Sequence, residues 1–244
     1  MLNKLKKDFL KLKNPKQAKI LQSFFKTGKG QYGEGDIFLG IKVPEQRKLA
    51  TKYKELESKY IEILLHSKIH EHRLTALFIL INHYKTMKTK GFQGAELGSS
   101  TTKRKKPIID LYLRNANNIN NWDLVDLSAP NLLGDYLLNK KRNKLYSLAK
   151  SKSLWKKRIA IVATFTFIKN NQYEDTINIA EILLKDKHDL IHKAVGWMLR
   201  EVGKRNIKTL ENFLNKNIRQ MPRTMLRYAI EKFPEKKRLY YLKK

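Results

Sequence analysis

Three segments of this chain share one pattern, in which a cation is followed by a densely apolar stretch and a basic end. They read HRLTALFILINHYK, KRIAIVATFTFIKN and HKAVGWMLREVGKR. Arg158 and Lys193, in the second and third segments, are 35 residues apart, and Trp122 precedes Arg158 by 36. A period of about 35–40 residues with two helices per repeat is typical of α-solenoids. Because the tetratricopeptide signature is missing, we expect an all-α solenoid of HEAT-like two-helix repeats, stacked so that they leave a concave face.

The rest of the chain is also helical in pattern. Apolar residues recur at i, i+3/i+4 and i+7, and no segment sustains strand-like alternation. All six prolines can occupy the first turn of a helix, where the missing N–H costs little. Eight of the eleven glycines fall within 28–40 and 91–98, so the helical stretches contain few glycines. We expect helices over 2–13, 15–27, 44–54, 57–67, 71–88, 103–117, 120–127, 130–139, 141–150, 153–169, 172–185, 188–203, 206–216, 222–232 and 234–242.

One spacing departs from the repeat. Arg73 lies 49 residues before Trp122, and the distance returns to the common range if the Gly/Ser/Thr-rich stretch 89–102 is an inserted loop. Such a loop could change access to a groove or be an inert surface excursion. We expect residues 1–244 to form a single repeat domain, which contains this inserted loop and a glycine-rich loop at 28–36.

The charge of the chain indicates its partners. Lys and Arg total 52 against 22 Asp and Glu, which gives 52 − 22 = +30. Such an excess attracts polyanions, with nucleic acid first and anionic membrane second, and predicts that the concave face is basic.

The chain has no cysteine, which excludes a disulfide framework and a thiolate metal site. Its longest apolar run, 159–168, is half of what a bilayer requires, and its first residues lack a secretory signal. We therefore expect a cytoplasmic monomer that needs neither a membrane nor a protein partner.

The predicted helix 188–203 places one tryptophan outside its apolar sector. Leu190, Ile191, Ala194, Val195, Met198, Leu199 and Val202 group on one side at 100° per residue. Trp197 lies roughly opposite them, in a stripe with Lys193, Arg200 and Lys204. Trp197 can pack under a neighbouring repeat beside solvated cations. Alternatively, the cations bind phosphates and the indole meets a sugar or a base.

A second tryptophan has a carboxylate near it. Trp122 and Asp126 are four residues apart in NNWDLVDL, so a helix places both on one face, whereas Asp123 points elsewhere. An isolated carboxylate on the presumed nucleic-acid face of a +30 chain weakens phosphate binding, so we expect it to have another purpose. Arg158 opens an apolar helix, where it either caps a buried pair or reaches across a groove to a phosphate.

Other motifs carry weaker signals. His188 and His192, four residues apart, lack a third metal ligand, and His70-Glu71-His72 at a helix start is no stronger. The loop GKGQYGEGD at 28–36 could cradle a phosphate but lacks the ending of a nucleotide-binding loop, which favours a flexible connector. We therefore expect no metal and no cofactor.

Four passages together resemble the AlkD family of bacterial DNA alkylation-repair glycosylases, which are built from HEAT-like repeats. They are FLGIKVPEQRKLA (38–50), NNWDLVDLSAPNLLGDYLL (120–138), LWKKRIAI (154–161) and HKAVGWMLRE (192–201). The resemblance implies that Asp126 is the catalytic carboxylate and that Trp122 and Trp197 flank the deoxyribose of the lesion. It also implies that Arg158 holds the DNA backbone and that Phe24 supplies a further aromatic contact.

The activity that this resemblance implies is hydrolysis of the N-glycosidic bond of cationic N3- or N7-alkylpurines in duplex DNA, without base flipping. A cationic base is already a good leaving group, so the enzyme has to stabilise the positive charge that develops on the sugar. One carboxylate can do so and position a water molecule, while indole faces add cation–π attraction. The alternative is a HEAT-like protein that binds DNA or RNA without catalysis.

Overall fold

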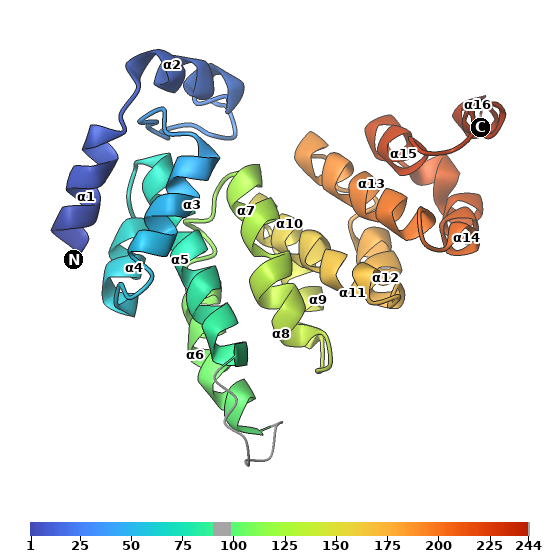
Figure 1. Cartoon of the computed structure of the whole chain (residues 1–244). Helices are drawn as coiled ribbons and strands as arrows, with labels where there is room; N and C mark the ends of the chain where they lie inside the picture. Colours follow the sequence, from blue (N-terminus) through green and yellow to red (C-terminus); the bar gives the residue numbers. More distant parts are fainter. Residues whose placement is uncertain (90–98, 244) are drawn as a thin grey trace. The chain divides into compact units, whose positions relative to one another are not determined.

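A computed structural model describes residues 1–89 and 99–243, with the side chains of all of them except 88, 89 and 99–102. The chain forms two compact units, Met1–Leu124 and Val125–Lys244. Both consist of helices (Figure 1). Within the described ranges the only β-type pairing is an isolated bridge between Ile37 and Ile69. The all-α solenoid class is therefore confirmed, whereas a single domain over 1–244 and a concave basic face stay predictions.

Helix α2 (Pro15–Phe24) of the first unit begins where its capping residue and its proline predict. The side chain of Asn14 accepts a hydrogen bond from the Gln17 amide, and Pro15 follows in the first turn. The helices are α1 (Leu2–Lys11), α2 (Pro15–Phe24), α3 (Val43–Lys52), α4 (Ser58–Leu65), α5 (His70–Thr89), α6 (Ser99–Arg114) and the start of α7 (Trp122–Ser128). Each lies within a few residues of an expected helix.

Two expectations fail or fall outside this description. Pro107 lies inside α6 and not in its first turn, because the helix begins at Ser99, before the expected residue 103. A proline there removes one helical hydrogen bond. Of the proposed inserted loop 89–102, residues 90–98 lie outside the described residues, and 99–102 belong to α6.

In the second unit, a π-helical turn follows α7. Behind α7 the chain continues through a π-helical turn, η1, in which the Gly134 amide donates to Ala129 O at 2.9 Å. The remaining elements are η1 (Pro130–Gly134), α8 (Asp135–Leu137), α9 (Asn143–Ala149), α10 (Leu154–Ala163), α11 (Phe165–Lys169), α12 (Glu174–Ile182), α13 (Asp189–Gly203), α14 (Ile207–Asn217), the 3₁₀ turn η2 (Ile218–Gln220), α15 (Arg223–Ala229) and α16 (Glu235–Lys243). The expected helix 153–169 is interrupted at Thr164, whose hydroxyl donates to Ile161 O at 2.6 Å.

Helix α13 forms the centre of the second unit. Six of the seven residues predicted for its apolar sector are buried, and Leu190 is half-buried. Gly196 lets α15 approach closely, because a Cβ there would lie 2.5 Å from Met225 O and 2.5 Å from the Tyr228 Cβ. Trp197 and the cations Lys193, Arg200 and Lys204 lie on the opposite side of α13.

No helix in the described part of the chain is both long and apolar enough to cross a bilayer.

Candidate functional site

Asp126 and Arg158 form a bidentate ion pair in the second unit. Asp126 lies on α7, and its Oδ1 and Oδ2 accept from Nε and Nη2 of Arg158 at 2.9 and 2.8 Å. The third nitrogen of the guanidinium, Nη1, donates to Leu190 O at 2.6 Å. The Arg158 side chain is 6 % exposed and that of Asp126 is 16 % exposed. Planar arginine matches a carboxylate at two points, so the pair fixes the orientation of Asp126.

This pairing corrects one expectation from the sequence. Asp126 is not an isolated negative charge, because a buried guanidinium balances it. The same contact corresponds to one of the two roles considered for Arg158, that of capping a buried pair. The two-point face of Arg158 is occupied by Asp126, so a phosphate can take that contact only in exchange for the carboxylate.

Trp197 and its neighbouring cations lie on the outer side of α13. The indole is half-buried and contacts Phe165 with ring centroids 5.8 Å apart. The three cations of the stripe all have acidic partners: Lys193 binds Asp189 at 2.7 Å, Lys204 binds Glu201 at 2.6 Å, and Arg200 pairs with Glu231. Asp189 and Glu201 belong to α13 itself, at helical spacing from their lysines, so the stripe combines cations with carboxylates that the sequence analysis did not consider.

Trp122 and Phe24 belong to an aromatic cluster in the first unit. Trp122 is half-buried and stacks on Phe25, with centroids 5.2 Å apart and 20° between the planes. Phe24, at the end of α2, is 61 % exposed and meets Trp122 edge-on at 6.0 Å. Phe25 stacks in turn on Phe38 at 5.1 Å. The two predicted aromatic contacts thus lie together, on top of a buried stack of rings.

Beneath this stack, His70 joins two carboxylates. Its Nδ1 lies 3.0 Å from Asp36 Oδ2 and its Nε2 lies 2.8 Å from Asp123 Oδ2. Arg73 donates to the other oxygen of Asp36 at 2.7 Å. Asn121 caps the first turn of α7 by accepting from the Trp122 amide at 2.8 Å. The start of α7, which carries Trp122, is therefore anchored to α5 through buried charges.

The geometry of this network sets the charge of His70. Burial opposes the charged imidazolium, but Asp123 and Asp36 outweigh it and raise the pKa of His70 to about 9. Burial also tends to raise the pKa of Asp36, but hydrogen bonding to His70 and the charge of Arg73 leave it lowered. His70 is thus a cation between two carboxylates at neutral pH.

Sequence reasoning considered His70-Glu71-His72 only as a weak metal motif and missed this network. In the structure the three side chains point to separate partners. Glu71 accepts from the amides of Leu39, Gly40 and Ile41, and His72 contacts the Ser67 hydroxyl at 3.0 Å. The available signal was Arg73 three residues after His70, which a helix places on the same face.

The other motifs of the sequence also have local partners. His188 caps α13 by accepting from the Leu190 amide at 3.1 Å, and His192 Nε2 contacts Asp186 O. In the glycine-rich loop, the amide of Gly30 donates to the Glu34 carboxylate at 2.8 Å. The Glu34 carboxylate therefore competes with any phosphate for this amide.

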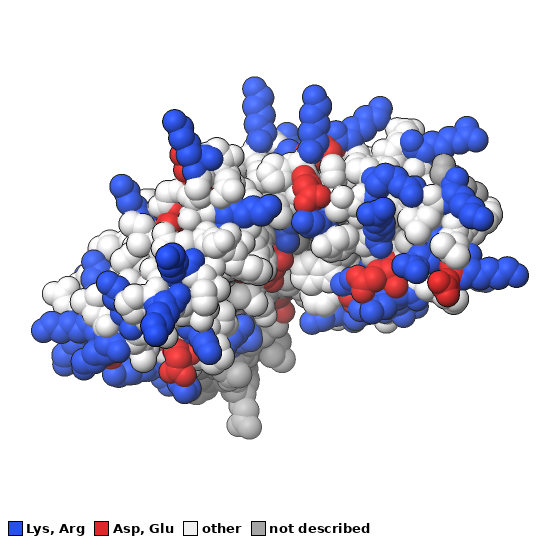
Figure 2. All heavy atoms as spheres, turned by 90° about the horizontal axis from the view of Figure 1, so that it is seen from above, with Lys and Arg blue, Asp and Glu red and all other residues white. Residues whose placement is uncertain are grey.

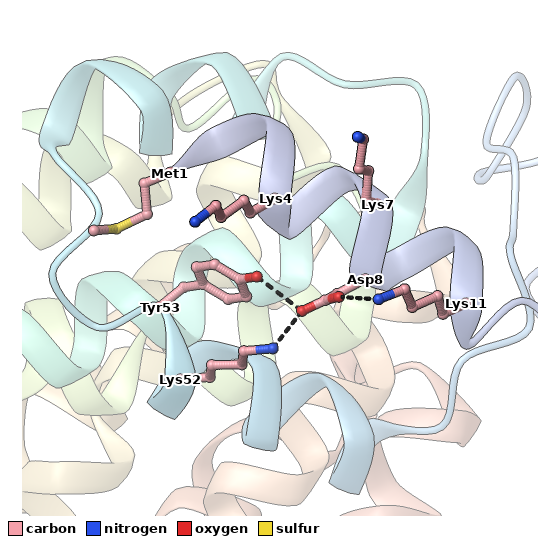
Figure 3. A pocket seen from close by; sticks show the side chains of 7 residues that line it. All are labelled: Met1, Lys4, Lys7, Asp8, Lys11, Lys52 and Tyr53. Carbon is pink, nitrogen blue, oxygen red and sulfur yellow. Dashed lines mark hydrogen bonds and ion pairs between the residues drawn. The ribbon is translucent and has the colours of Figure 1, made fainter.

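Cations cover much of the surface seen in Figure 2, with few carboxylates between them. Around α1, lysines line a cavity of about 500 Å³ together with Asp8 and Tyr53 (Figure 3). Asp8 accepts from Lys52 at 2.6 Å and from the Tyr53 hydroxyl at 2.8 Å, and these hydrogen bonds lower the pKa of Asp8 to about 2. Asp8 is therefore ionised at neutral pH and offsets part of the positive charge of this cavity.

Comparisons with known proteins agree with one another. A family model described as "DNA alkylation repair enzyme" matches residues 5–233. A solved structure described as a predicted DNA alkylation repair enzyme from Enterococcus faecalis superposes with a TM-score of 0.66. It is 15 % identical, and the match covers 91 % of this chain and 97 % of that one. A search of curated proteins found no significant match.

Proposed function

Because this chain belongs to the DNA alkylation repair enzyme family, we propose that it is a DNA glycosylase that removes cationic N3- and N7-alkylpurines from duplex DNA. The observation that carries the proposal is the Asp126 carboxylate, held at both oxygens on the helix that also carries Trp122 four residues earlier. In an alkylation repair family, an oriented carboxylate is the group suited to a sugar cation.

In the proposed reaction, water adds to the anomeric carbon while the bond to the alkylated base breaks. The base leaves with the bonding electrons and becomes neutral, so it needs no strong general acid. Positive charge develops on the sugar, and the Asp126 carboxylate stabilises it and accepts the proton of the attacking water. Trp122 and Trp197 add cation–π attraction beside the sugar. The lesion stays in the stack, and its lability supplies the selectivity.

The ion pair between Asp126 and Arg158 gives the substrate a way to expose this charge. A phosphate of the lesion strand offers Arg158 the same planar, two-point contact that the carboxylate offers. In our proposal Arg158 turns toward the phosphate and leaves Asp126 facing the sugar. In the free protein Arg158 balances the charge of the carboxylate, and once DNA is bound that charge faces the sugar.

Cations would hold the DNA backbone outside the reacting sugar. We assign Lys193, Arg200 and Lys204 to this contact, since phosphates can replace their present acidic partners, and Phe24 to an exposed aromatic contact. The protein acts as a cytoplasmic monomer without a cofactor. Its affinity for DNA should fall by roughly 0.9 log units per log unit of salt for each phosphate that it neutralises.

The test is base release from a duplex that contains 7-methylguanine, with Asp126→Asn beside the wild type. The variant keeps a hydrogen-bonding group of the same shape but loses the charge, so we expect release to slow by about 10²- to 10³-fold. Asp110→Asn, an exposed carboxylate on α6, is the matched control and should release base at the wild-type rate. Equal rates for Asp126→Asn and the wild type would refute the role of Asp126.

The second candidate is a protein that binds DNA or RNA without catalysis. The balanced charge of Asp126 favours it, because the pair with Arg158 also suits a purely structural role. Tight binding of duplexes with no release of base, and no effect of Asp126→Asn, would support this reading. Competition between duplex DNA and structured RNA would then identify the preferred nucleic acid.

A further inference from the structure

A cavity of about 190 Å³ lies inside the first unit, next to the aromatic stack. Its apolar wall consists of side chains from α2, the 38–41 segment, α3 and α5: Leu21, Phe25, Phe38, Ile41, Val43 and Leu74. Lys42 and Val43 also line it and are exposed, so the cavity reaches the surface beside them. Pockets for drug-sized ligands occupy about 300–1,000 Å³, so this one suits a single small ring system.

One polar atom at this cavity lacks a partner. Gln46 is 3 % exposed, and its Nε2 donates to Ile41 O at 2.8 Å, but its Oε1 has no hydrogen bond. Since Ile41 O can only accept, the amide nitrogen has to face it, which leaves the oxygen as the unpaired atom. A buried acceptor without a donor is costly, and a ligand could supply that donor.

The remaining polar groups of the lining narrow the chemistry of such a ligand. Both ring nitrogens of His70 contact carboxylates, and Glu71 is occupied by three backbone amides. Asp123 accepts one hydrogen bond at each oxygen and retains further lone pairs. The donors are Gln17, the second N–H of the Gln46 amide and the exposed Lys42. The lining therefore offers the acceptors of Gln46 and Asp123 beside the side chains of Phe25 and Phe38, and it suits a flat ring that bears N–H groups.

We propose that this cavity binds a purine base, with an N–H of the base donating to Gln46 Oε1 and its ring lying against Phe25 and Phe38. Free purines carry N–H donors on a flat ring, and bound bases are held by hydrogen bonds and by stacking against aromatic or apolar side chains. The choice of a purine among donor-bearing rings rests on the proposed function, whose product is an alkylpurine. Phe25 lines the cavity and also stacks on Trp122. The cavity therefore adjoins the residue that we propose to flank the lesion.

The experiment is a calorimetric titration of the full chain, without DNA, with adenine and with 9,N6,N6-trimethyladenine, which has the same ring but no N–H. We expect one adenine per chain and binding of the methylated ring that is at least about tenfold weaker. Gln46→Met should weaken adenine about tenfold and remove the difference between the two ligands, whereas Gln22→Met, an exposed position on α2, should behave as wild type. Val43→Trp, at the mouth, should block both ligands. Thermal melting of each variant establishes that it is folded.

Two results overturn the proposal: a folded wild type that does not bind adenine at millimolar concentration, or equal adenine affinity in Gln46→Met and wild type. Competition with a duplex containing 7-methylguanine separates the two sources of the base. Adenine binding that the duplex leaves unchanged, with full duplex affinity in Gln46→Met, assigns the cavity to the free base and agrees with a lesion that stays in the stack. Weaker duplex binding by Gln46→Met would place the lesion base in the cavity and contradict the unflipped lesion of the proposed function. These titrations involve no bond cleavage. A protein that fails to excise bases can therefore still bind adenine, and a protein that excises bases can fail to bind adenine. The failure of this proposal is thus distinguishable from the failure of the proposed function.

Discussion

Replacement of His70 by glutamine tests the buried network that anchors α7. His70 is 2 % exposed and contacts Asp36 and Asp123, and Arg73 is the other cation facing this group. Glutamine keeps an amide donor group but carries no charge, so both carboxylates lose their shared cation. The consequence should depend on pH, because only the protonated imidazole donates to both.

The magnitude follows from the pKa of about 9 in the folded chain against an ordinary value of 6.5. The difference of about 2.5 units, at 1.36 kcal/mol per unit, gives about 3 kcal/mol. The folded state binds the proton more tightly than the unfolded chain, so the free energy of unfolding falls as pH rises. This contribution is complete below pH 6.5 and is lost by the time the pH has passed 9.

Urea denaturation of the wild type and His70→Gln at intervals from pH 6 to 9.5 measures the effect. The two proteins share their remaining lysines and carboxylates, so the difference between their unfolding free energies isolates His70. We expect this difference to shrink by about 3 kcal/mol between pH 6.5 and 9. A difference that stays constant with pH would refute a charged His70 in the folded protein. An NMR titration of the imidazole provides a direct value for comparison.

Three further substitutions test other parts of the structure. Gly196→Ala places a methyl group against the backbone of α15, so we expect calorimetry to record a loss of about 2 kcal/mol of stability; unchanged melting would contradict that packing. Arg158→Met strips Asp126 of its charge partner and should cost about 3 kcal/mol in urea denaturation, part of which Asp126→Asn restores in the double variant; full additivity would argue against the pair. Phe24→Ala should weaken duplex binding about tenfold in a fluorescence assay and change stability by less than about 1 kcal/mol, and unaltered affinity would remove Phe24 from the interface.

Most helices could be predicted from the sequence because they depend on local signals. Asn14 followed by Pro15, for example, specifies both the cap and the first turn of α2. Pro107 was misplaced because a proline is compatible with a first turn but does not require one, and the helix extends before it. The π turn at Pro130–Gly134 depends on close packing of Gly134 against Ala163 O, which no periodicity encodes.

The candidate site was only partly visible in the sequence. Helical spacing identified Trp197 as lying outside the apolar sector of its helix, and it is half-buried there. Spacing could not reveal that Arg158 binds Asp126, because the two are 32 residues apart and meet only through tertiary packing. The same holds for His70, whose partners Asp36 and Asp123 are 34 and 53 residues away. Asp126 was interpreted as an isolated charge because its partner Arg158 lies on another helix.

The account depends on whether this protein accelerates base loss. The most direct measurement is the single-turnover rate of 7-methylguanine release from a duplex at saturating protein, compared with the same duplex alone and with Asp126→Asn. We predict release by the wild type well above the spontaneous rate, and release by Asp126→Asn close to it while duplex affinity is retained. Wild-type release at the spontaneous rate, from a duplex that the protein demonstrably binds, would contradict the glycosylase assignment.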